Sequence, residues 1–165
     1  GAPQERRDLQ TDIAAPEESS MPKADANQRY DYDPAYPADI LKSVNTIALV
    51  GASADETKFS NDVMRVLQEA GYDIIPVNPN PNLTEIRGLK VYHSLEAIDR
   101  RVDMVEVFRP KEEFYGFAEK AIAIGAKVLW GQLDIYDDRA AALAEKAGLK
   151  VVMDRCPKIE LSRPN

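Results

Sequence analysis

Five short apolar runs, rich in β-branched and other aliphatic residues, recur along the chain. Each is bounded by glycine, proline or polar residues, and each is too short for a buried helix. Continuous apolar runs of this length are typical of strands that are buried on both faces of a parallel sheet. They predict strands over residues 46–50, 72–77, 103–108, 127–130 and 151–153.

Between these runs the apolar residues recur with helical spacing. In residues 61–70, Val63, Val66 and Leu67 fall on one side of a helix, and Gly71 follows as a stop signal. The remaining helices are predicted over residues 37–44, 94–98, 110–125 and 136–147.

Alternation of strands and helices implies right-handed crossovers and a parallel sheet that is covered on both faces. We therefore predict an α/β fold with a Rossmann-type doubly wound, mainly parallel sheet of about five strands and helices on both faces. Residues 80–90 are interpreted as a polar connection, and Val91 and Tyr92 as a short extension of the sheet. Ligands of such sheets bind at the carboxyl ends of the strands, where the strand order reverses.

Residues 1–36 differ from the rest of the chain. They contain four prolines, scattered acidic residues and few large aliphatic side chains. Such a segment cannot bury enough apolar surface to offset its ordering entropy. We predict a flexible N-terminal arm over residues 1–36, followed by one domain over residues 37–165. In the alternative, the last third of the arm docks through Tyr30, Tyr32 and Tyr36.

Composition narrows the functional classes. The formal net charge of -7 disfavours nucleic acid as a partner, because an acidic surface repels phosphates. No apolar run reaches the length that spans a bilayer, and the N-terminus lacks the apolar stretch of a signal peptide. One cysteine, Cys156, and one histidine, His93, disfavour a disulfide or a structural zinc site. We expect a cytoplasmic protein without nucleic-acid or membrane partners.

The first strand runs into a loop of small residues, Gly51-Ala52-Ser53, before the next helix. Small residues allow close approach of a ligand to the backbone, and a helix N-terminus offers free N–H groups to an anion. Lys58 adds a full positive charge, so this loop predicts a phosphate site. In the alternative, the loop is only a tight turn, and Ser60 or Asn61 caps the helix.

The other strand ends add polar residues and exclude some ligands. The second strand is followed by Asn78 and Pro79 where dinucleotide-binding enzymes place an acid for the ribose, and the G-x-G-x-x-G and P-loop motifs are absent. NAD is therefore disfavoured, whereas ADP stays open. Arg109 follows the third strand and suits phosphate oxygens, or it pairs with Glu112 or Glu113.

Taken in order, these strand ends resemble one family. The chain is similar to the stand-alone CoA-binding domain proteins, which are small relatives of the N-terminal domain of the succinyl-CoA synthetase α subunit. The resemblance covers about residues 37–160, and the arm lies outside it. It is carried by residues 50–53, 58–61, 71–72, 76–80, 88–92, 94–95, 102–105, 108–109, 125–127, 130, 132 and 153–156.

The resemblance implies that coenzyme A lies in the crevice at the strand ends. Its diphosphate would face the small-residue loop and Lys58, its adenosine end would lie at residues 77–79, and the far wall would include Gln132. The family often has glycine where this chain has Asp134. The full set of implied ligand-binding residues is Gly51, Ala52, Ser53, Lys58, Asn61, Val77, Asn78, Pro79, Phe108, Arg109 and Gln132.

We expect a non-catalytic CoA or acyl-CoA binding protein. One alternative is an enzyme or ligase-like subunit acting on acyl-CoA or on CoA thiols through Cys156, because the neighbouring Arg155 and Lys158 could lower the pKa of its thiol. A structural role for this cysteine is the simpler interpretation. A second alternative is a regulatory domain that binds an adenine nucleotide. A homo-oligomer and an enzyme subunit both stay open as protein partners.

Overall fold

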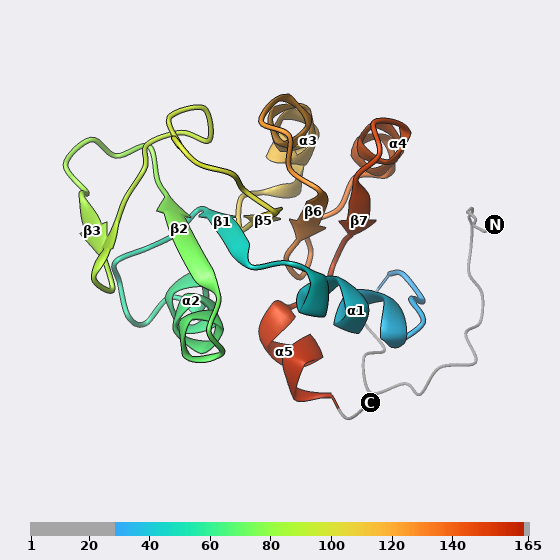
Figure 1. Ribbon diagram of the computed structural model, residues 1–165, viewed down its shortest axis with the longest axis horizontal. Coiled ribbons are helices and arrows are strands. Elements are labelled where there is room, and N and C mark those ends of the chain that lie inside the picture. Colours follow the sequence, from blue (N-terminus) through green and yellow to red (C-terminus); the bar gives the residue numbers. More distant parts are fainter. Residues whose placement is uncertain (1–28, 164–165) are drawn as a thin grey trace.

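The computed structural model describes residues 29–163 and contains one five-stranded parallel sheet (Figure 1). In sheet order the strands are β2-β1-β5-β6-β7, so the order reverses between β1 and β5. The predicted α/β, Rossmann-type fold is therefore confirmed, in the 2-1-3-4-5 variant of the doubly wound sheet. The strands are β1 (Thr46–Val50), β2 (Asp73–Val77), β5 (Met104–Val107), β6 (Val128–Gly131) and β7 (Lys150–Val152).

Helices cover both faces of this sheet (Figure 1). Because successive strand residues point to opposite faces, Ala48 and Val50 pack on one side while Ile47 and Leu49 pack on the other. The first side carries α3 (Phe114–Ala123) and α4 (Asp138–Lys146), and the second carries α1 (Ala35–Ser43), α2 (Phe59–Glu69) and α5 (Pro157–Ser162). Within residues 29–163, no helix combines the length and apolar character that crossing a membrane requires.

The structure corrects three local predictions. The helix expected over residues 94–98 is a single turn, in which the Ser94 hydroxyl accepts a hydrogen bond from the amide of Ala97 at 3.1 Å. The connection over residues 80–90 contains a small hairpin of β3 (Glu85–Ile86) and β4 (Leu89–Lys90). Helix α5 was not predicted, because six residues are too few for a helical period to show. The extension at Tyr92 is confirmed, since it forms a parallel bridge with Val77.

Residues 29–36 lie against β7, which is an outer strand of the sheet. The Tyr36 hydroxyl donates to the carbonyl of Val151 at 3.0 Å and accepts from its amide at 3.2 Å. The Tyr32 hydroxyl accepts from the amide of Met153 at 3.0 Å. These are contacts that the docking alternative calls for in this stretch. Residues 1–28 of the predicted arm lie outside the described residues.

Candidate functional site

The loop after β1 lies at the point where the strand order reverses, and Gly51 places it against the end of β5. Gly51 has a φ of +90°, and a Cβ atom there would lie only 2.9 Å from the carbonyl oxygen of Phe108. Its amide and that of Ala52 donate to the carbonyl of Val77 at 3.1 and 3.3 Å. The ends of three adjacent strands are thereby joined, as a crevice at the switch point requires.

Two asparagine side chains fix the same loop. The Asn78 amide donates to the carbonyl of Ala52, and the Asn61 amide donates to the carbonyl of Ser53, both at 2.8 Å. Asn61 is 2% exposed, so its bond is shielded from water. The Ser53 hydroxyl accepts from the amide of Asp55 at 3.1 Å. In the free protein, these predicted ligand-binding side chains therefore hold the loop in shape.

Helix α2 begins directly after this loop without a side-chain cap. Lys58 is the N-cap residue, so the alternative in which Ser60 or Asn61 caps the helix is wrong. The Lys58 side chain is exposed. Hydrogen bonds from Thr57, and to a lesser extent the charge of Lys58, hold the pKa of the Asp55 carboxyl below its usual value. The helix start thus combines uncapped backbone N–H groups with a nearby positive charge.

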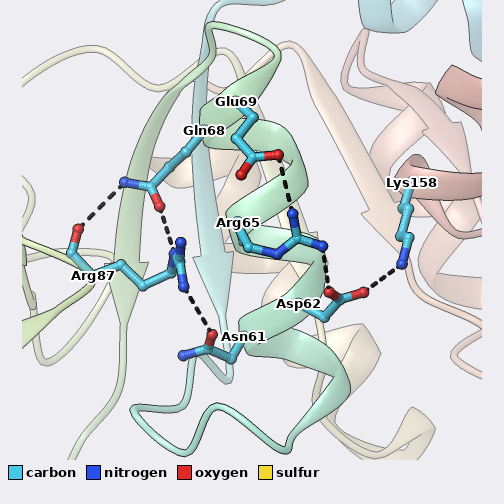
Figure 2. A network of polar contacts seen from close by, with 7 residues as sticks. All are labelled: Asn61, Asp62, Arg65, Gln68, Glu69, Arg87 and Lys158. Atoms are coloured by element: carbon cyan, nitrogen blue, oxygen red, sulfur yellow. Dashed lines mark hydrogen bonds and ion pairs between the residues drawn. The ribbon is translucent and has the colours of Figure 1, made fainter.

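Polar contacts attach α2 to elements on both of its sides (Figure 2). On one side the Arg87 guanidinium, from the turn of the β3–β4 hairpin, donates to Gln68 at 2.8 Å and to Asn61 at 3.4 Å. On the other side Asp62 accepts from Lys158 of α5, and this bond is the largest cause of the lowered pKa of Asp62. Helix α2, which follows the loop, is therefore held by the β3–β4 hairpin on one side and by α5 on the other.

An open cleft of about 350 Å³ lies beside the loop. The Phe59 and Phe108 rings meet edge to face with 6.0 Å between their centroids. Phe108 and Gln132 were predicted as site residues, whereas the other members of the cleft were missed. Phe59 carries the clearest sequence signal, because it is a large aromatic residue soon after the glycine loop. In the structure it is 46% exposed. The lining residues are Phe59, Phe108, Gln132, Leu133, Asp134 and Ile135.

Gln132 is a buried cleft residue whose amide has unused hydrogen-bonding capacity. It is 3% exposed, and neither Oε1 nor Nε2 has a satisfactory hydrogen bond among the described residues. The neighbouring Cys156 thiol interacts with it, but sulfur is a weak partner. An unpaired buried amide costs free energy. A polar ligand group that formed a hydrogen bond with it would remove this cost.

Asp134, also in the cleft, has an unusual backbone. Its φ is +68°, in the left-handed region that glycine adopts at least cost. Its amide donates to the Asp154 carboxylate at 2.6 Å. The conformation of the loop therefore suits the glycine that the family resemblance leads us to expect at this position.

Arg109 forms the ion pair that was its alternative interpretation. Its Nε and Nη2 atoms donate to the two carboxylate oxygens of Glu113 at 3.0 and 2.8 Å. Both side chains are more than two-fifths exposed, so the pair adds little stability. The pKa of Glu113 is lowered, chiefly by this hydrogen bond. Contact of Arg109 with a ligand stays a prediction, as it does for Val77 and for the exposed Pro79.

Cys156 does not have the environment that the thiol-exchange alternative needs. Its side chain is fully buried, and burial raises the pKa of the thiol. The Arg155 guanidinium lies 4.9 Å from the centre of the Tyr32 ring, and Lys158 is bound to Asp62. The expectation that these two cations lower the pKa of Cys156 is therefore wrong.

The sheet order and the glycine loop at the reversal point, with a cleft beside it, define a Rossmann-type domain. The sequence places it more narrowly. The CoA binding domain family matches residues 45–162, and the chain belongs to this family.

Three similar proteins extend this result. An uncharacterized protein of Bacillus subtilis (strain 168), YneT, is 38% identical over 121 residues, which are 73% of this chain and 88% of that protein. A hypothetical protein from Pyrococcus horikoshii OT3, whose structure has been solved, is 37% identical, with a TM-score of 0.73 over 78% of this chain and 89% of that one. The dinucleotide-forming acetyl-coenzyme A synthetase 1 of Ca. Korarchaeum cryptofilum shares the fold, with 24% identity and a TM-score of 0.57 over 68% of this chain and 27% of that one.

Proposed function

We propose that the protein binds coenzyme A or an acyl-CoA in the cleft at the reversal point of the sheet, and that it does so without catalysing a reaction. The observation that carries this proposal is the cleft beside the Gly51 loop, which is lined in part by Gln132, a residue whose buried amide has no satisfactory partner among the described residues. Pantetheine is a chain of methylene groups interrupted by amides. Its chemistry fits an open, largely apolar cleft that is lined in part by a glutamine.

The diphosphate is assigned to the loop over residues 51–53 and to the start of α2. The loop carbonyls of Ala52 and Ser53 are bound to asparagine side chains, so they do not face an anion as free acceptors. The uncapped helix start and Lys58 supply N–H groups and positive charge. This local charge offsets the acidic balance of the whole chain.

The non-catalytic part of the proposal rests on the one cysteine and the one histidine of the chain. Cys156 is buried with a raised pKa, and the His93 ring lies 2.9 Å from the carbonyl of Leu83. Among the described residues, no group of three or more potential ligands could hold a metal ion. Binding of ADP alone by a regulatory domain is the competing proposal, and the ligand panel below separates the two.

Calorimetric titration with CoA, acetyl-CoA, dephospho-CoA, ADP and NAD tests the function. We expect CoA to bind, NAD to give no binding heat, and the melting temperature to rise with CoA concentration. Lys58→Ala should weaken CoA binding, whereas Lys42→Ala, an exposed lysine at the end of α1, should leave it unchanged. Binding of ADP with the affinity of CoA would favour the nucleotide alternative, and binding of none of the five ligands would refute the proposal.

A further inference from the structure

One buried carboxylate connects the cleft to the segment that precedes α1. Asp154 follows β7 and is 3% exposed. Its Oδ1 atom accepts the amide of Asp134, which lines the cleft, at 2.6 Å. Its Oδ2 atom accepts the amide of Arg29 at 2.9 Å. Hydrogen bonds to an ionised acceptor are stronger than neutral ones, so both chain segments are firmly held at the same group.

The segment over residues 29–36, here called the docked segment, also contacts the chain just beyond the cleft. The Tyr30 hydroxyl donates to Asp138 at 2.6 Å. The Arg29 guanidinium lies 4.1 Å from the centre of the Tyr136 ring. Residues 136 and 138 lie just after the cleft residues 132–135 in the chain. The docked segment therefore contacts the chain next to the cleft wall.

Undocking of this segment would leave several groups without their protein partners. The Arg155 guanidinium, whose side chain is 6% exposed, donates to the carbonyl of Tyr30. The amides of Val151 in β7 and of Met153 directly after it are paired with tyrosine hydroxyls. On undocking these groups would exchange their protein partners for water, so each bond contributes a modest net stabilisation to the docked state. The docked segment is therefore an integral part of the folded domain, although the family match begins only at residue 45.

We propose that the docked segment positions the cleft wall at Asp134 through Asp154, and that the cleft binds its ligand more tightly when the segment is docked. The second half of this inference rests on the proposed CoA function, whereas the first half concerns the free protein. The left-handed backbone of Asp134 is unfavourable for a residue with a side chain, and the carboxylate bond holds it in place. Coupling of this kind is reciprocal, so a bound ligand should also stabilise docking.

Amide hydrogen exchange of the free protein, followed by NMR, tests the coupling without a ligand. The variant Tyr32→Phe/Tyr36→Phe removes the hydroxyls that bind the β7 edge, and Tyr72→Phe removes a hydroxyl that binds the carbonyl of Leu41, outside the cleft. We expect exchange at Asp134 to accelerate roughly fivefold or more in the double variant and to change little in the control. Faster exchange across residues 29–36 with unchanged exchange at Asp134 would refute the coupling.

Calorimetric titration of the same variants with CoA tests the effect on the ligand. We expect the Kd of the double variant to rise roughly fivefold or more, with the control at the wild-type value. Asp154→Asn should act like the double variant. Asparagine has only one side-chain oxygen, and its NH2 group cannot accept a hydrogen bond, so one of the two backbone N–H groups loses its acceptor. Equal affinity of all variants would refute the positioning role while CoA binding stands. If the wild type does not bind CoA, the proposed function fails, and the exchange experiment still decides the coupling.

Discussion

The two walls of the site, which are the Gly51 loop after β1 and the cleft residues after β6, use their amide side chains in opposite ways. On the β1 side, the side-chain amides of Asn61 and Asn78 donate hydrogen bonds to carbonyls of the Gly51 loop. On the β6 side, the Gln132 amide is buried to a similar degree as Asn61 but has no satisfactory partner among the described residues. The first wall is therefore completed by the fold, whereas the second retains hydrogen-bonding capacity.

Because of this difference, we expect the two walls to contribute to ligand binding in different ways. A loop whose carbonyls are already bound needs little rearrangement when an anion arrives, so its contribution is preorganisation. A buried amide without a partner lowers the stability of the free protein, and a ligand that satisfies it removes this cost. The following predictions test the contrast through stability and affinity, measured separately.

The largest loss of stability is expected at Gly51, where the loop meets Phe108. In Gly51→Ala, the new Cβ atom would lie 2.9 Å from a carbonyl oxygen while the residue keeps a φ of +90°. Left-handed strain and overpacking together should lower the free energy of unfolding by about 3 kcal/mol. Urea denaturation measures the loss, and CoA binding should become too weak to detect.

Gly71→Ala is the matched control for that variant. Gly71 has a φ of +97°, but a Cβ atom there would meet nothing within 4 Å. Its loss should therefore be limited to the conformational strain of about 1 kcal/mol. If Gly51→Ala loses no more than this control, the loop does not depend on close contact with Phe108.

The second prediction is that substitutions in the two walls change the free energy of unfolding in opposite directions. Asn78→Ala leaves the carbonyl of Ala52 unpaired and should lower the unfolding free energy by about 1–2 kcal/mol. Gln132→Leu removes an unpaired buried amide and should raise it by about 1 kcal/mol. Both should weaken CoA binding. Chemical denaturation with calorimetry distinguishes the two, and destabilisation by Gln132→Leu would show that its amide already has a partner in the free protein.

The sheet could be predicted because its evidence is local. Each buried strand leaves a continuous apolar run, and the boundaries of β1 agree with the prediction to the residue. The β3–β4 hairpin leaves no such signal, since each of its strands has two residues. Helix α2 begins at Phe59, two residues before its predicted start, because the loop residues that precede the apolar period resemble a cap.

The site was less predictable because it depends on contacts between distant residues. Strand ends drew attention to Phe108 and Gln132, which line the cleft, but sequence cannot show whether a buried amide finds a partner. Adjacent residues can also mislead. Arg155 and Lys158 flank Cys156 in the chain, yet their side chains contact Tyr32 and Asp62.

The third prediction concerns Glu106, in the strand between the two walls. Its side chain is fully buried, neither carboxylate oxygen has a partner among the described residues, and burial raises its pKa well above 4.5. The folded state therefore keeps a proton that the unfolded state loses. The stabilisation from this group is complete below pH 4.5 and is lost as the pH rises toward the folded-state pKa.

Comparison with Glu106→Gln isolates this effect from the other acids. The unfolding free energy of the wild type minus that of the variant should fall as the pH rises above 4.5, by at most about 1.4 kcal/mol per pH unit. Urea denaturation between pH 4 and pH 8 (a range of about four pH units) measures this slope. A difference that is independent of pH would mean that Glu106 is ionised in the fold, with a compensating partner.

The smallest effect is expected at Asp134, on the wall with unused capacity. In Asp134→Gly the φ of +68° becomes unstrained, but glycine also gains freedom in the unfolded chain, so stability should change by less than about 1 kcal/mol. Affinity for CoA should rise a few-fold, because a carboxylate beside the cleft repels a polyanionic ligand. Asp134→Asn keeps the side-chain size and removes only the charge. Equal gains in both variants identify charge as the cause, a gain in glycine alone identifies the backbone, and no gain in either would mean that Asp134 points away from the bound phosphates.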